Sequence, residues 1–131
     1  MASIRNLDRQ SARTYTRWLA YARIGLGVSA VLAPTLPARP WVGDDADRPA
    51  VKVLARALGG RDIALGLGAV LALSHDGPVR GWIEGAALAD AGDLAATLLS
   101  FRSLPRAGRL GIVGVTVGAV VAARVLAPLV D

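Results

Sequence analysis

The sequence predicts an all-α, membrane-embedded four-helix bundle in which four short transmembrane helices run up-down-up-down. Hydrophobic residues fill 53% of the 131 positions and charged residues 19%, and the mean hydropathy is positive, at +0.46. The aromatic residues are few, with three Trp, two Tyr and one Phe. A soluble core of this size usually relies on larger side chains, whereas small ones suit helices that pack closely in lipid.

The third observation behind this fold class is the division of the chain into four apolar segments of one domain. Each segment is close to the ~20 residues that a helix needs to cross ~30 Å of hydrocarbon. Loops are expected between them, because Pro, Gly and charged residues gather there. The expected helices are 18–36, 54–74, 81–101 and 110–130, the loops are 37–49, 75–80 and 102–109, and residues 1–17 form a basic cytoplasmic tail.

A soluble four-helix bundle is the alternative fold. No segment has the ~18 uncharged residues of a plain spanning helix, and the longest uncharged stretch runs from Ile24 to Ala38. However, the first and fourth segments are apolar in every direction around a helix, with no polar stripe to face water. Lipid is therefore the expected neighbour.

The distribution of basic residues predicts the orientation. Arginines cluster before the first segment, which favours a multi-pass protein of the cell membrane with its N-terminus, and after four spans its C-terminus, in the cytoplasm. Three aspartates in the first loop agree with an external position for that loop. The bias is small, with five basic residues on the cytoplasmic side and six on the other, so dual insertion stays open. The arginines of the tail are Arg5, Arg9, Arg13 and Arg17.

Ionisable residues inside the expected spans are the most informative feature for function. Each charge in hydrocarbon costs on the order of 2.5 to 3.5 kcal/mol, so such residues need partners. Bases and acids are equal in number. The bases are Arg23, Arg56, Arg61 and Arg124, and the acids are Asp62, Glu84, Asp90 and Asp93.

A rise of ~1.5 Å per residue places these groups in two layers of the bundle. The layer nearer the N-terminal side holds Arg23, Arg124, Glu84 and Asp90, and the layer near the midplane holds Arg61, Asp62 and Asp93.

The directions of these side chains predict their partners. Asp90, Asp93 and Thr97 follow the helical period with Ala86, so their face should point into the bundle. Arg61 and Asp62 diverge by about 100° as helix neighbours, which leaves Asp93 as the expected partner of Arg61.

This polar core supports several functions. It could serve helix packing alone, or it could line a wet cavity that makes the protein a ligand-binding or accessory membrane protein. A membrane-embedded enzyme doing acid/base chemistry on a lipophilic substrate and a small proton-coupled transporter are the alternatives. We expect most carboxylates to be paired, which leaves at most Asp90 or Glu84 free. The ligand or proton-binding candidates are Asp90, Glu84, Asp93, Arg61, Asp62, Arg23, Arg124 and Thr97.

The expected partners are the lipid bilayer, a lipophilic small molecule and a second copy of the chain, with no nucleic acid. The basic tail, with Trp18 and Tyr21 at the entrance of the first span, is typical of an anchor to anionic lipid. Cysteine is absent and His75 is the only histidine, so neither a metal site nor a cofactor is expected. Gly111, Gly114 and Gly118 share one helix face, which indicates close helix packing.

Residues 56–66, Arg-Ala-Leu-Gly-Gly-Arg-Asp-Ile-Ala-Leu-Gly, are followed by a helix that carries Asp90 and Asp93. This arrangement resembles an uncharacterised family of small four-helix membrane proteins, a domain of unknown function with an Arg-Asp-x-x-Leu-Gly motif, from high-GC bacteria and some fungi. The resemblance covers about residues 15–128. It implies the four-helix membrane fold, and it implies no particular activity or cofactor.

Overall fold

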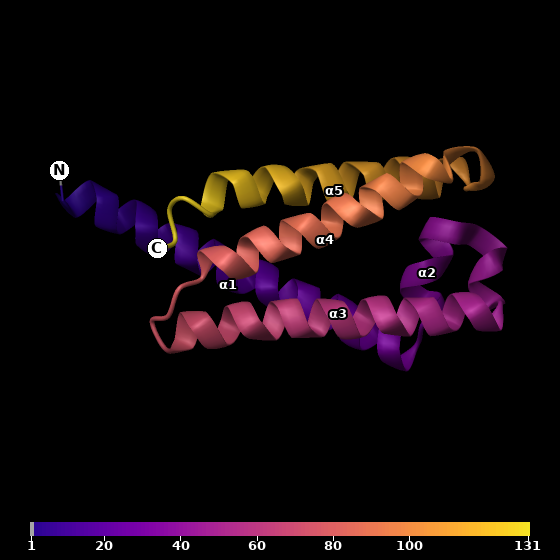
Figure 1. Ribbon diagram of the computed structural model, residues 1–131, viewed down its shortest axis with the longest axis horizontal. Coiled ribbons are helices and arrows are strands. Elements are labelled where there is room, and N and C mark those ends of the chain that lie inside the picture. Colours follow the sequence, from indigo (N-terminus) through magenta and orange to yellow (C-terminus); the bar gives the residue numbers. More distant parts are fainter. Residues whose placement is uncertain (1) are drawn as a thin grey trace.

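The computed structural model is helical, with short connections, over the part of the chain that it describes: the backbone of residues 2–131 and the side chains of residues 8–131. Successive long helices run antiparallel, and both ends of the chain lie at the same end of the bundle (Figure 1). The predicted all-α fold with four long helices is confirmed. The long helices are α1 (Ala2–Leu32), α3 (Pro49–Ser74), α4 (Arg80–Leu99) and α5 (Arg106–Leu126), and the short ones are α2 (Thr35–Val42) and the 3-10 helices η1 (Gly43–Asp47) and η2 (Phe101–Ser103).

Proline and a distant carboxylate set most of the helix boundaries. Pro34 separates α1 from α2, and the chain bends by 97° at this break. Pro49 is the first residue of α3, where its missing N–H costs no hydrogen bond, and Pro105 directly precedes α5. The start of α4 is capped from the other end of the sequence, because the carboxylate of Asp131 accepts hydrogen bonds from the backbone N–H groups of Val79 and Arg80 at 2.8 and 3.0 Å. The C-terminal segment is thereby fixed beside the α3–α4 turn.

The helix boundaries differ from expectation at two places. Residues 37–49, expected to be a loop, contain most of α2 and all of η1. An eight-residue helix can include Pro40 because few of its N–H groups need partners within the helix. The helix ends at Val42 and is capped by Gly43, whose φ of 68° suits glycine. Residues 2–17, expected to be a tail, are helical and continuous with α1, since no Pro or Gly occurs before Gly25. The predicted role of Arg5 concerns a side chain outside the described part.

Close glycine packing joins α1 to α3. A Cβ atom on Gly59 would lie 2.6 Å from the carbonyl oxygen of Gly27 and 2.9 Å from the Cβ of Ala30. Further along the same pair of helices, a Cβ on Gly66 would lie 2.7 Å from the carbonyl oxygen of Ala20. The two backbones approach so closely that no larger residue fits at these glycines. These contacts make α1 and α3 one rigid layer.

The glycines of α5 do not pack as predicted. A Cβ atom added to Gly111, Gly114 or Gly118 would meet no atom within 4 Å among the described residues. These glycines lie on the outer face of α5 beside the exposed Val115 and Val121. Their spacing places them on one face, but spacing alone does not tell which face of a helix meets its neighbours.

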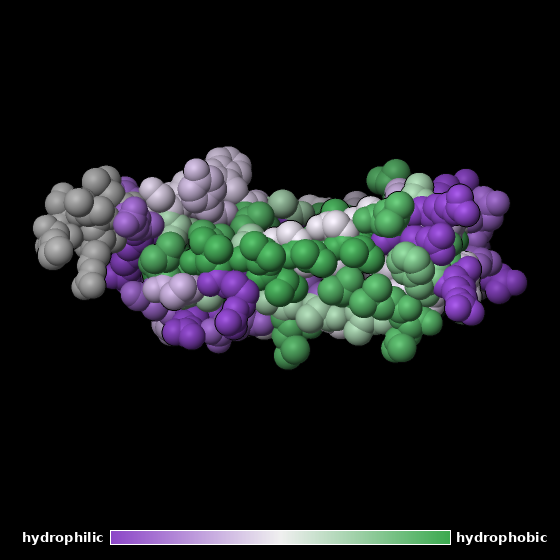
Figure 2. Space-filling view, turned by 90° about the horizontal axis from the view of Figure 1, so that it is seen from above, coloured by the Kyte–Doolittle hydropathy of each residue, from purple (hydrophilic) through white to green (hydrophobic). Residues whose placement is uncertain are grey.

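The outer surface has the pattern of a protein that crosses a membrane. Hydrophobic side chains cover the middle of the face seen in Figure 2, and hydrophilic ones gather toward both ends. Within the described chain, α3 and α5 are long and apolar enough to span a membrane, and the bent α1–α2 pair would make a third span. Helix α4 has 20 residues but carries Glu84, Asp90 and Asp93. Two to three candidate spans are therefore established by length and composition.

The α1–α3 contact predicts opposite effects for two neighbouring glycines. Gly59→Ala should destabilise the bundle by about 1–3 kcal/mol, because the added methyl overlaps the α1 backbone. Gly60→Ala is the matched control, since nothing lies within 4 Å of its Cβ position, and it should stabilise the helix by up to about 1 kcal/mol. Reversible unfolding in detergent micelles measures both. Equal effects of the two substitutions would contradict the close approach.

Candidate functional site

Five ionisable side chains from three helices form one continuous chain of ion pairs. Arg23 of α1 donates from one Nη to Asp62 of α3 at 3.0 Å and from the other to Asp90 of α4. Arg61 of α3 donates to both oxygens of Asp93 of α4, at 2.9 and 2.8 Å. Asp62 also accepts from Arg61 at 3.2 Å, which joins the two halves. The order along this Arg–Asp chain is Asp90, Arg23, Asp62, Arg61, Asp93.

The Arg–Asp chain lies inside the bundle. Asp62 and Asp90 are 7% and 8% exposed, and the side chains of Arg23 and Asp93 are 18% and 19% exposed. The fork of Arg61 holds the carboxylate of Asp93 through two parallel hydrogen bonds, which is the strongest geometry for such a pair. The predicted pairing of Arg61 with Asp93 is confirmed.

Helical spacing explains why these groups meet. On α4, Asp90 and Thr97 are buried and Asp93 is partly buried, so the predicted inward face of this helix is confirmed. Thr97 satisfies its hydroxyl on its own helix by donating to the carbonyl oxygen of Asp93 at 2.7 Å. On α1, Thr16 and Arg23 are two turns apart and share an inward face.

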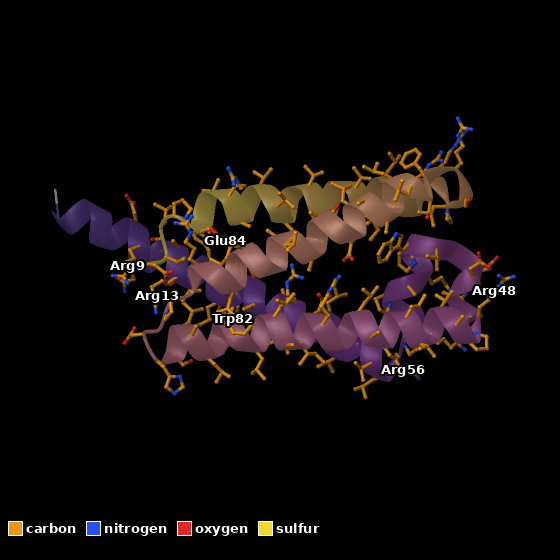
Figure 3. The ribbon with its side chains drawn as sticks, in the orientation of Figure 1. Arg9, Arg13, Arg48, Arg56, Trp82 and Glu84 are labelled. Carbon is orange, nitrogen blue, oxygen red and sulfur yellow. The ribbon has the colours of Figure 1, made fainter. Side chains whose placement is uncertain are left out.

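A cavity of about 410 Å³ lies beside the Arg–Asp chain. Its walls come from the four long helices and α2, and most of the residues in them are apolar. One side is closed by Trp82, which points from α4 toward α3 (Figure 3) and packs its ring on Gly68. One end is lined by Trp41, whose backbone lies against Gly108 of α5. The polar residues in the wall are Thr16, Arg23, Arg61, Asp62, Asp90, Asp93 and Thr116.

The cavity opens between α1 and α5. Both helices line it without packing closely against each other. The cavity-lining residues Leu19, Leu26 and Val115 are each at least half exposed. The opening therefore lies on the side of the bundle, between these two helices.

Three polar atoms at the cavity have no partner among the described residues. Thr16 is 4% exposed, and its hydroxyl makes no hydrogen bond. Asp90 binds Arg23 through Oδ2, which leaves Oδ1 free, and Asp62 receives all its hydrogen bonds on Oδ1, which leaves Oδ2 free. Buried polar groups normally have partners, and of these three atoms the Thr16 hydroxyl oxygen is the one that is itself fully buried. The cavity thus offers one unpartnered hydroxyl and two free carboxylate oxygens.

Two of the residues predicted to belong to the site lie outside it. Glu84 is about half exposed and pairs with Arg80 of its own helix at 2.7 Å, near the end of the bundle that holds Arg9 and Arg13 (Figure 3). Arg124 is exposed on α5 and makes no hydrogen bond or ion pair with any residue whose side chain is described. Neither residue contacts Arg23 or Asp90, because equal depth does not fix the direction in which a side chain points around its helix.

The expected separation of Arg61 from Asp62 is also wrong. The long side chain of Arg61 folds back, so that its Nε and Nη2 lie 3.4 and 3.2 Å from Oδ1 of Asp62. Arg56, the remaining base, is exposed and donates to the carbonyl oxygen of Val31 at the end of α1. The two predicted layers are therefore a single chain of ion pairs.

Sequence reasoning missed Thr16, Trp41 and Trp82 as cavity residues. The seven-residue spacing of Thr16 and Arg23 is a signal for a shared face. Trp41 lies in α2, where the sequence predicts a loop. The contact of Trp82 with Gly68 joins two different helices, so the spacing of residues within one helix does not predict it.

The ion pair of Arg61 with Asp93 predicts strong coupling. Arg61→Met and Asp93→Asn should each destabilise the protein by about 3–5 kcal/mol, because each leaves an uncompensated charge in the interior. The double variant should lose less than the sum of the two losses. A double-mutant cycle measured by unfolding in lipid or detergent tests this, and coupling near zero would show that the pair does not form.

Comparison of the chain with protein-family models, curated proteins and solved structures finds no match. The resemblance to small four-helix membrane proteins remains a prediction. The function of the site is therefore argued from its own geometry.

Proposed function

We propose that this chain is a multi-pass membrane protein with four spans that binds a lipophilic small molecule in the cavity beside the Arg–Asp chain. The observation that carries the proposal is the cavity itself, about 410 Å³ in volume with mostly apolar walls and one polar wall. This combination is typical of small-molecule sites, in which a few polar groups orient an otherwise apolar ligand.

A four-span arrangement is supported by the way the long helices share one length of the bundle. Helix α4 runs beside α3 and α5 (Figure 1), so a membrane that surrounds α3 and α5 also surrounds α4. Its acids Asp90 and Asp93 face the interior, where each pairs with an arginine. Inward-facing, paired charges are the arrangement in which a spanning helix tolerates them.

Binding is favoured over acid/base catalysis by the state of the carboxylates. Asp62, Asp90 and Asp93 each accept a hydrogen bond from an arginine. Each of these carboxylates is therefore held in an ion pair, and none of them is left as a wholly free acid or base. Ligand binding is therefore favoured over the two alternatives, a membrane-embedded enzyme and a proton-coupled transporter. The side opening between α1 and α5 gives a ligand its route from lipid.

The topology of this proposal has a direct test. A reporter fused after Asp131 should be cytoplasmic and one inserted near Asp45 extracytoplasmic, because the basic tail precedes the first span. Both sites on the same face would contradict four spans. Comparable labelling of each site from both faces would instead show dual insertion.

The cavity predicts that a single substitution blocks binding. Ala119→Phe should fill the cavity that Ala119 lines, whereas Val117→Phe adds the same ring to the exposed face of α5. The measurement uses a bromophenyl-butyl alcohol, whose bromine quenches nearby tryptophan, and a Trp18→Phe background that retains Trp41 and Trp82 in the cavity wall, with protein in phosphatidylcholine nanodiscs. We expect saturable quenching that Ala119→Phe abolishes and Val117→Phe preserves. Quenching that is equal in the two variants would show that the probe sits in the bilayer, and ligand binding in the cavity would be wrong.

A further inference from the structure

We propose that the ligand of this cavity is a lipophilic monocation, such as a protonated amine on an apolar body, whose charged end binds Asp90. This inference rests on the proposed function and adds the chemical class of the ligand. It starts from the charge of the Arg–Asp chain, which contains three aspartates and two arginines. With every member ionised, the chain carries one unbalanced negative charge.

Among the residues whose side chains are described, no further ion pair reaches the Arg–Asp chain. The nearest other acid and base on α4, Glu84 and Arg80, pair with each other and are exposed. Arg56 and Arg124 are exposed as well, and Arg56 donates to a backbone carbonyl. A net charge in an apolar interior is unfavourable unless a counter-charge lies beside it. A cation in the cavity supplies that counter-charge.

The hydrogen bonds indicate where a cation would bind. Both oxygens of Asp93 are held by Arg61, and Oδ1 of Asp62 is surrounded by two arginines. Asp90 has a single arginine partner on one oxygen, and its Oδ1 has no partner in the described chain. Asp90 is therefore the least neutralised acid and lines the cavity. The free Oδ2 of Asp62 offers a second acceptor.

The unpartnered hydroxyl of Thr16 independently points to a ligand in the same cavity. Thr16 and Arg23 are seven residues apart on α1, which corresponds to about 10 Å along the helix. The space between them is lined by apolar residues such as Ala20, Leu19 and Ile83. A ligand whose cationic end binds Asp90, whose apolar body covers this wall and whose far end carries a hydrogen-bonding atom beside Thr16 would satisfy both polar groups.

An anionic ligand fits the site poorly. Each arginine already faces two carboxylates, so an added anion would meet a group of side chains that is negative in sum. A neutral ligand would leave the unbalanced charge in place. A preference for a cationic, a neutral or an anionic ligand can therefore be distinguished by the order of affinities among ligands that differ only in their charged end.

The experiment compares three brominated probes that share the bromophenyl-butyl chain and end in an ammonium, a hydroxyl or a carboxylate group. Tryptophan quenching is measured in the Trp18→Phe background in phosphatidylcholine nanodiscs at neutral pH, and only the saturable part that Ala119→Phe removes is counted. We expect the ammonium probe to bind about tenfold or more tightly than the alcohol, as a charge-assisted hydrogen bond predicts, and the carboxylate to bind weakest.

Matched variants assign the preference to Asp90. Asp90→Asn should reduce the ammonium-to-alcohol preference to near one while the alcohol still binds. Glu84→Gln removes the same charge at an exposed, paired position and should leave the preference unchanged. A preference that survives Asp90→Asn, or falls equally in both variants, would overturn the assignment.

The comparison of probes on the parent protein does not depend on how the variants fold. If the alcohol binds in a manner that Ala119→Phe blocks and the ammonium binds no more tightly, the cavity is a ligand site and the inference of a cation is wrong. If no probe shows quenching that Ala119→Phe removes, the proposed function itself fails.

Discussion

The double ion pair of Arg23 is the interaction on which the rest of the structure depends. Its guanidinium reaches Asp62 on α3 and Asp90 on α4, so that one side chain of α1 connects three helices. The α1–α3 layer is held by close glycine contacts and needs no such help. Between that layer and the α4–α5 pair the contacts are fewer, and the cavity occupies the space. Arg23 thus joins the two halves of the bundle at the edge of an opening.

This arrangement has a physical consequence for stability. Buried ion pairs are usually no more stabilising than well-packed apolar side chains. The free energy needed to remove the charges from water is about as large as the free energy of their attraction. A bundle that required only stability could fill the space between its layers with leucine. Here the space is open, its walls carry a free oxygen on Asp90 and a free hydroxyl on Thr16, and Trp41 and Trp82 define its limits. The polar wall accordingly fits a role in recognition, as well as one in holding the helices.

The parts of the fold that depend on local spacing could be predicted from sequence. The pairing of Arg61 with Asp93 follows from equal depth on neighbouring antiparallel helices, and the inward face of α4 follows from the helical period. Depth fails for Glu84 and Arg124, because it does not specify the direction in which a side chain points around its helix. The prediction for the α5 glycines fails for the same reason. Helix α2 is hidden in the sequence because Pro37 and Pro40 suggest a loop, although a helix of eight residues can include them. Trp41 therefore gives no sign in the sequence that it belongs to the cavity wall.

The central claim is that Arg23 and Arg61 bind three aspartates inside the helical bundle, and solid-state NMR of the protein in lipid tests it most directly. Protein labelled with ¹⁵N in the arginine guanidinium and ¹³C in the aspartate carboxyl allows each nitrogen–carbon proximity to be measured by dipolar recoupling. We expect short-range contacts between arginine nitrogens and aspartate carboxyl carbons at sites that water does not reach. These contacts should disappear one by one in the Asn variants of Asp62, Asp90 and Asp93. If the only contacts come from exposed pairs at the ends, such as Arg48 with Asp45, the interior chain of ion pairs does not exist and the account is wrong.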